Sequence, residues 1–400
     1  MTAEPDLAAQ AHAERALVWP FPLDDPYPSY AAMRVKDPVQ WSDELALAAW
    51  LVLSHQHAMA VLCGPEWSAD PRHNPDLFER LGGNRPGGGL LAKMLLFGPH
   101  PPDHDRLRRA VNRFFTPQGV KALQPRIATL TSAAFAALPT DTPVEVMASV
   151  AHPLPLAVIC ELLNVGTDVA ELLEAETPTL AAILDPLASE ADRQASAASG
   201  LALMLALVPV VAERQRSPGE DLLTTLLEVL DSDDAIVMAL LLLAAGHETT
   251  ANLIGNGTLA LSEHLDQLQL LRQNPVLLPT AVEELLRWDS PVQVVGRLAR
   301  AATMLGGHHI ATGEQVLVII GATNRDPAVF DHPDLLDITR HTPGPLAFGH
   351  GAHYCVGAAL ARAEATEVFR RLITSPLRVI DWERPPATTF RRFSRLTMFA

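Results

Sequence analysis

Apolar residues recur with the spacing of one helix face along most of the chain, whereas strand-like patterns lie near both ends. The helical spacing dominates from Pro117 onward and predicts helices at 121–138, 168–174, 191–215 and 219–230. Alternating or β-branched stretches predict a hairpin from 39–41 and 50–53, and further strands at 292–299, 315–320, 378–380 and 396–399. The pattern therefore predicts a mainly α-helical fold with small β-sheets.

One predicted helix is much longer than the others. It begins near Ser232, whose side chain suits an N-cap, and runs through His247 towards Leu261. About 30 residues at 1.5 Å per residue span roughly 45 Å. The helix is apolar on most faces, so we expect it to cross the core. A shorter helix follows Pro275 and Pro279 and ends by Trp288.

The composition is that of a globular protein with ample core material. The chain has 400 residues, of which 48% are apolar and 19% charged, and we find neither a linker nor an internal repeat. We expect an N-terminal extension at 1–24, followed by one domain at 25–400. The net charge of −16 argues against nucleic-acid binding, which requires a basic face.

The sequence also predicts a soluble, cytoplasmic protein. Its three cysteines are too few and too scattered for a disulfide framework, which favours a reducing compartment. Cys160 lies in the apolar run 154–163, so we expect it in the core, and Cys63 is expected to be structural. Residues 1–16 lack the pattern of a signal peptide, and the most apolar stretch, 235–245, is too short to span a membrane.

The strongest chemical signal surrounds Cys355, which has three glycines nearby and precedes an apolar helical run at 358–372. Glycines permit tight turns and close approach, and a helix N-terminus favours a thiolate over a thiol. A thiolate in such a loop suits an axial ligand of haem iron. Two alternatives are a buried cysteine in a turn and a zinc site formed with His350 and His353. The zinc site fits poorly, because three ligands within six residues stand without a second cluster.

The segment resembles the haem-binding loop of the cytochrome P450 family. All six specified positions of Phe-Gly-x-Gly-x-His-x-Cys-x-Gly are filled, by Phe348, Gly349, Gly351, His353, Cys355 and Gly357. The resemblance extends over roughly residues 25–399, with further motifs in the family's order. It implies a triangular, mainly helical domain that binds haem b through Cys355. It also implies a soluble bacterial-type haem-thiolate monooxygenase, which inserts one oxygen atom from O2 into a C–H or C=C bond.

The long helix contains Gly246, Glu248 and Thr249 within Ala-Gly-His-Glu-Thr-Thr. An acid and a hydroxyl are costly to bury in an apolar helix without partners, so a solvent-facing polar patch is the simplest interpretation. The segment nevertheless resembles the family's oxygen-binding motif. The resemblance implies that Gly246 leaves room for dioxygen, and that Glu248 and Thr249 relay protons.

Glu284 and Arg287 stand three residues apart on one predicted helix face. Alone they would be a surface ion pair, but the family carries a structural Glu-x-x-Arg pair at this place. The family's third member lies in a Pro-x-Arg-Phe segment, and here residues 333–336 have neither the arginine nor the phenylalanine. Candidates to replace it are Asn324, Arg325 and Arg340.

The resemblance also implies contacts to the two haem propionates, which require cationic or hydrogen-bonding partners. They are His104, Arg108, Arg297 and His353; ordinary surface charges are the alternative. Electrons from NAD(P)H would arrive through separate partners, because the chain has no flavin or iron–sulfur motif. A basic cluster on the cysteine side predicts docking of a ferredoxin or flavodoxin with its reductase. Solvated arginines without a docking role are equally expected. The cluster comprises Arg106, Arg109, Arg113 and Arg362.

The resemblance places a mostly apolar substrate cavity beside the long helix. The expected lining is Leu241, Ala244, Ala245, Val292, Gln293, Val295, Met94, Leu95 and Phe393, although plain core packing explains each apolar member as well. Such a cavity suits a small hydrophobic substrate. Rival functions are a peroxide-driven peroxygenase or a non-oxidative haem enzyme on the same scaffold, and a non-catalytic haem or zinc protein. Glu248 and Thr249 disfavour the enzymes on the same scaffold, which often lack this pair.

Overall fold

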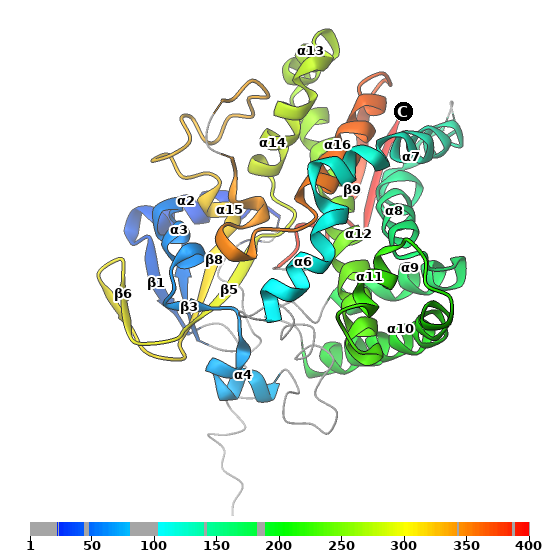
Figure 1. The fold of residues 1–400 in the computed structure, drawn as a ribbon. Coiled ribbons are helices and arrows are strands. Elements are labelled where there is room, and N and C mark those ends of the chain that lie inside the picture. The colour runs from blue at the N-terminus through cyan, green and yellow to red at the C-terminus, as the bar shows by residue number, and fades with distance from the viewer. Residues whose placement is uncertain are drawn as a thin grey trace, which may run out of the picture.

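The computed structural model describes residue 22 and residues 24–43, 48–80, 103–139, 142–181, 189–341, 344–385 and 389–399. Figure 1 shows most helices gathered on one side and the largest sheet on the other, with one long helix passing through the middle. Residues 1–21, Met94 and Leu95 lie outside the described part of the chain.

Each predicted helix is present and in the predicted order, with differences mainly at the ends, and the structure adds further helices that the pattern did not predict. The run 358–372 is confirmed without change, whereas the helix expected at 219–230 covers only Leu222–Leu227. The main helices are α2 (Tyr27–Lys36), α3 (His55–Cys63), α4 (Pro75–Arg80), α6 (Asp103–Phe115), α7 (Pro117–Ala136), α8 (Pro153–Leu163), α9 (Thr167–Ala181), α10 (Glu190–Arg216), α11 (Leu222–Leu227), α12 (Ser232–Glu263), α13 (Leu265–Gln273), α14 (Leu278–Trp288), α15 (Ile320–Thr323) and α16 (Ala358–Leu372).

The described residues form three sheets, two of which join strands from distant parts of the sequence. The five-stranded sheet has the order β1 (Val39–Ser42), β2 (Ala49–Val52), β8 (Gln315–Ile319), β5 (Val294–Ala299) and β3 (Trp67–Ser68), and only the β2–β8 pair is parallel. The second sheet has the order β4 (Val144–Glu145), β10 (Arg395–Phe399) and β9 (Arg378–Glu383), and β6 (Thr303–Leu305) pairs with β7 (His308–Ile310). The predicted strands are confirmed. The strands β3, β4, β6 and β7 were not predicted, because they are too short to show an alternating pattern.

The long helix α12 is the centre of the core, as the sequence predicts, and packs against α8, α10 and α16. Gly257 allows this close packing, since a Cβ there would lie 2.4 Å from Phe369 Cζ. The expected cap is wrong by one residue: Asp231, not Ser232, accepts a hydrogen bond from the Asp234 amide. The longer carboxylate reaches the third amide of the helix from that position.

Two helices are long and apolar enough to cross a membrane by length and composition alone. They are α12 and residues 191–216 of α10, whose apolar windows are 67% and 33% buried. The stretch 235–245, judged too short from the sequence, is thus part of a helix of sufficient length. Buried core helices meet the same criterion, and most of α12 is buried here.

Candidate active site

The loop before α16 folds around Cys355 in two short helical turns, Leu346–Phe348 and Gly351–His353. The Cys355 amide donates to the Phe348 carbonyl at 2.9 Å, which closes the loop. Gly349 and Gly351 have φ values of +68° and +74°, a region that glycine adopts without strain. A Cβ at Gly351 would also lie 2.7 Å from the Leu62 carbonyl oxygen. The backbone therefore requires glycine at 349 and 351 of the motif.

The Cys355 side chain is exposed, yet protein encloses it closely enough for desolvation to be the largest influence on its acidity. Exposure of the residue and desolvation of its thiol are compatible when open surface lies above the sulfur and low-polarity protein surrounds its other sides. Burial raises the pKa of the thiol, while hydrogen bonds from the Gly357 and Ala358 amides and the charges of Arg108 and Arg362 lower it. The expected effect of the helix N-terminus is present. These influences do not outweigh burial, so the pKa of the free thiol remains raised.

Most of α12 is buried, but its middle turn presents a less buried face. Ala245 is exposed, and Leu241, Ala244 and Thr249 are half-buried. The Thr249 hydroxyl donates to the Ala245 carbonyl one turn earlier, at 2.9 Å. These residues stand three to four apart and so share one side of the helix. The structure thus brings together the predicted distal residues of α12 on an accessible face.

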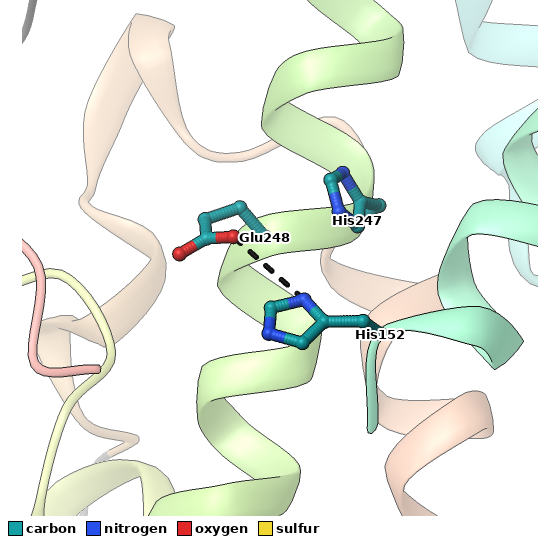
Figure 2. A group of neighbouring side chains, drawn as sticks. All are labelled: His152, His247 and Glu248. Atoms are coloured by element: carbon teal, nitrogen blue, oxygen red, sulfur yellow. Dashed lines mark ion pairs between the residues drawn. The ribbon is translucent and has the colours of Figure 1, made fainter. Parts of the chain in front are cut away.

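Glu248 does not form a solvent-facing patch, because only 6% of it is exposed. Its Oε1 accepts a hydrogen bond from Asn252 Nδ2 at 3.3 Å, and its Oε2 lies 3.8 Å from His152 Nδ1 (Figure 2). Gly246 is half-buried, and a Cβ there would lie 3.4 Å from Ile159 Cγ1 on α8. The missing side chain of Gly246 therefore faces α8.

Glu284 and Arg287 form a buried ion pair, with Arg287 Nε 2.7 Å from Glu284 Oε2. Arg340 Nε adds a second charged partner at 3.1 Å from the same oxygen. Arg287 also donates to the main-chain carbonyls of Asn324, Pro333 and Leu335. The segment 333–336, which lacks the expected arginine, contributes main-chain carbonyls that accept from Arg287, while Arg340 supplies the additional positive charge. The Asn324 side chain accepts from the Leu346 amide at 2.7 Å, which links this cluster to the cysteine loop.

The four predicted propionate contacts lie in three separate segments. His104 of α6 and His353 are close, with ring centroids 4.8 Å apart, and Arg108 is near enough to Cys355 to influence its pKa. Arg297 of β5 is buried, and its recorded hydrogen bond goes to the Gly296 carbonyl at 2.8 Å. Burial lowers the pKa of Arg297, and no described carboxylate pairs with it. A buried guanidinium without an acidic partner fits a group that brings its own carboxylates.

Comparison with known proteins identifies the family. The sequence model of the family Cytochrome P450 matches residues 193–375 of this chain. The vitamin D(3) 25-hydroxylase of Pseudonocardia autotrophica is 40% identical over 359 residues, which cover 87% of this chain and 85% of that protein. The 6-deoxyerythronolide B hydroxylase of Saccharopolyspora erythraea is 36% identical, with 87% and 88% covered.

The chain belongs to the cytochrome P450 family. The crystal structure of P450BioI in complex with an acyl carrier protein ligated to hexadec-9Z-enoic acid agrees, with a TM-score of 0.87, 32% identity, and 94% of this chain and 98% of that chain covered. The protein is therefore a cytochrome P450 monooxygenase that binds haem b. The predicted fold is confirmed, and the alternatives of a non-catalytic haem protein and a zinc protein are not supported.

The residues present in this P450 fit haem b. The donor set is an exposed cysteine, a buried arginine with which no described carboxylate pairs, and the neighbouring rings of His104 and His353. Haem needs one axial ligand and partners for two propionates, and these residues match both needs in chemical type.

Several residues expected to line the substrate cavity have other roles. The amide of Gln293 is buried; it donates to the Ser290 carbonyl at 2.8 Å and accepts from Tyr30 Oη at 3.3 Å. Phe393 is buried, stacks edge-on against Trp382, and lies beside Gly255. Val292 and Val295 are half-buried, and Val292 forms an isolated bridge with Phe390. Leu241, Ala244 and Ala245 are thus the expected lining residues with the clearest open surface.

The expected basic docking cluster is smaller than the sequence implies. Arg362 pairs with Glu283, donates to Tyr354 Oη at 3.0 Å, and covers the Phe348 ring. Arg109 and Arg113 are exposed on α6, and Arg113 contacts the Thr225 hydroxyl. The side chain of Arg106 lies outside the described part. Arg362 thus serves mainly to hold the loop against α14.

Sequence reasoning missed His152, which contacts Glu248 from the turn that precedes α8. The two residues are far apart in the sequence, and no spacing rule relates them. Sequence offers only the presence of one histidine in the largely apolar stretch 146–160.

Proposed function

We propose that Cys355 is the axial ligand of the haem iron and that Glu248 and Thr249 deliver protons on the opposite side. This assignment rests on an exposed cysteine in the loop before α16, together with one accessible turn of α12, the otherwise buried helix on which α16 packs. Haem iron, when bound, supplies the activation of O2 and the transfer of one oxygen atom to the substrate. Ligand substitution at Cys355, described in the Discussion, tests the assignment.

The protein residues would act on the proton supply and the local polarity. Thr249 donates its hydroxyl proton to the Ala245 carbonyl, so its oxygen remains available to accept a hydrogen bond on the accessible face. Glu248 is held by Asn252 on one side and faces His152 on the other. A carboxylate adjacent to that hydroxyl can take up a proton and pass it on. Leu241, Ala244 and Ala245 exclude water from the same face.

We propose His104, Arg108, Arg297 and His353 as the propionate contacts. Arg297 has the strongest support, because its guanidinium is buried without an acidic partner in the described chain. A charge-assisted hydrogen bond to a propionate would offset the desolvation of this arginine.

We propose a hydrophobic substrate with few polar groups. The accessible residues of α12 are leucine and alanine, and the amide expected as a polar contact, Gln293, is engaged inside the protein. The names of the relatives, a vitamin D(3) hydroxylase and a macrolactone hydroxylase, indicate the same class. Titration with secosteroids and macrolactones, followed by the spin-state change of the ferric haem, tests this proposal. A preference for small charged molecules would contradict it.

We propose a ferredoxin or flavodoxin, with its reductase, as the electron donor. The supporting feature is the exposed face of α6, which packs against α16 and carries Arg109 and Arg113. An acidic donor would be attracted there, and salt would slow its association. Reduction rates measured against ionic strength test the idea, and rates independent of salt would argue against it.

A single domain at 25–400 and a soluble, cytoplasmic protein complete the proposal. Strands from both ends of the chain share sheets, since β2 pairs with β8 and β4 pairs with β10. A boundary between these segments would break both pairs. Recovery of the protein in the soluble fraction without detergent tests the location.

A peroxide-driven peroxygenase is the second candidate, since it uses the same scaffold and the same ligand. The buried Glu248 and the adjacent Thr249 favour the O2-dependent reaction, because peroxide brings its own protons. Turnover with hydrogen peroxide alone, at a rate equal to that with the full electron-transfer chain, would favour the second candidate.

A further inference from the structure

Three metal-binding side chains meet between α8 and α12 (Figure 2). His152 lies just before α8, and His247 and Glu248 are consecutive in the middle of α12. One ligand atom from each residue lies within 4.8 Å of the other two. Two imidazoles and one carboxylate form a ligand set that Zn²⁺ takes in proteins, with a water molecule as fourth ligand.

His247 leaves one ring nitrogen unpartnered in the described part of the fold, although the ring also interacts with the Leu243 main chain. It is 1% exposed, and its Nδ1 has no hydrogen-bond partner there. A buried polar nitrogen without a partner is destabilising by about 1–3 kcal/mol. A metal ion is one partner that would satisfy this nitrogen.

The neighbours of the buried Glu248 carboxylate compensate its negative charge only weakly. Its contacts are the long hydrogen bond from Asn252, at 3.3 Å, and the His152 nitrogen at 3.8 Å. Neither lysine nor arginine pairs with it among residues the structure describes. A cation at this point would offset the desolvation of the carboxylate. His152, whose side chain is 24% exposed, gives an ion access from outside.

We propose that His152, His247 and Glu248 bind one divalent transition-metal ion, and that Zn²⁺ fits this site best. Tetrahedral zinc with bonds near 2.0–2.1 Å places its ligand atoms about 3.3 Å apart. The ligand atoms lie up to 4.8 Å apart, so each pair must approach by roughly 1.5 Å at most to bind zinc. Rotation of the Glu248 side chain and of the partly exposed His152 ring provides this movement.

Metal binding has a consequence that rests on the proposed function. An ion on Glu248 removes its carboxylate from proton delivery, so the zinc-bound enzyme would oxygenate more slowly than the metal-free enzyme. Binding itself does not depend on that role. Zinc that binds at these residues without slowing turnover would preserve the metal site and overturn the proton-delivery role of Glu248.

Equilibrium dialysis of the haem-containing enzyme against Zn²⁺, after chelation and desalting, tests the site. The protein should carry Cys63→Ser, because Cys63 is an exposed thiol that would bind zinc itself. We expect one ion per chain. His152→Ala and, separately, Glu248→Gln should weaken binding at least about tenfold, the smallest loss expected for a metal-site partner.

His309→Ala is the matched control, since it removes an exposed histidine on β7 far in sequence from the cluster. It should bind zinc like the parent protein. The carbon monoxide spectrum of each variant verifies that the haem site is intact. Absence of bound zinc in the parent, or equal binding by the parent and His152→Ala, would overturn the proposal.

Discussion

Arg340 Nε lies 3.2 Å from Oε1 and 3.1 Å from Oε2 of Glu284, and so completes the buried cluster begun by Arg287. The sequence left three candidates for this position. The structure selects Arg340, because the Asn324 side chain bonds Ser290 and Leu346, and Arg325 donates to the Trp288 carbonyl. Glu284 accepts a further hydrogen bond from the Asp337 amide at 2.9 Å.

Arg340→Ala should lower the free energy of unfolding by about 1–3 kcal/mol, since a buried carboxylate loses a charged partner but keeps Arg287. Denaturant titration of the haem-bound protein measures this. Arg395→Ala is the control, because its partner Asp381 is exposed and surface pairs contribute about 1 kcal/mol or less. Equal destabilisation by the two substitutions would show that the third charge does not support the cluster.

Arg297→Gln should increase the rate of haem loss by about tenfold or more, as expected for a lost charge-assisted hydrogen bond. Transfer of haem to an excess of a colourless acceptor protein gives that rate. Arg300→Gln, three residues further on and exposed, should release haem like the parent protein. Unchanged haem release by Arg297→Gln would remove Arg297 from the propionate contacts.

Thr249→Ala should uncouple the reaction: NADH consumption continues, product falls and hydrogen peroxide rises. The hydroxyl that accepts and orients a proton donor on the accessible face is then absent. The ratio of product to NADH measures coupling. Thr250→Ala is the neighbouring control, because Thr250 is buried and its hydroxyl donates to the Gly246 carbonyl at 3.3 Å. Full coupling in Thr249→Ala would exclude Thr249 from proton delivery.

Stability should fall as pH rises through neutrality because of Glu364. Burial raises the pKa of its carboxyl to about 8, against an ordinary value of 4.5. Below pH 4.5 both states hold the proton, so the group has no effect. Between pH 4.5 and 8 the unfolded chain releases a proton that the folded chain keeps, and stability declines until the folded group also ionises.

Glu364→Gln should therefore be more stable than the parent at pH 8, by on the order of a few kcal/mol, and similar to it at pH 4.5. Thermal unfolding at the two pH values measures the difference. Glu367→Gln, on the same helix, removes a carboxylate that pairs with Arg370 and Arg371, and should show no such gain. A parent–variant difference that does not change with pH would refute this role of Glu364.

Elements with a strong local pattern were predictable from the sequence. The run 358–372 is bounded by the glycine-rich loop and is recovered without change, and the long helix was located within two residues at its C-terminal end. Two-residue strands such as Trp67–Ser68 were not predictable, because pairing with a distant strand, and not local alternation, defines them.

The candidate site also has features that the sequence predicts and features that it does not. The loop of Cys355 was predictable because its glycines and cysteine are adjacent in sequence. The partner of Glu248 was not, since His152 reaches it only when α8 packs on α12. The environment of Gln293 was also hidden: the sequence places it near the distal side, but its amide bonds Tyr30 and Ser290.

The absorption spectrum of the dithionite-reduced carbon monoxide complex tests the central claim most directly. With Cys355 as ligand, the wild-type Soret band should lie at the red-shifted position of thiolate-ligated haem, and Cys63→Ser should leave it there. Cys355→His should move the band to the position of histidine-ligated haem and abolish oxygenation. A wild-type band at the histidine position, or a thiolate band that persists in Cys355→Ser, would contradict the assignment.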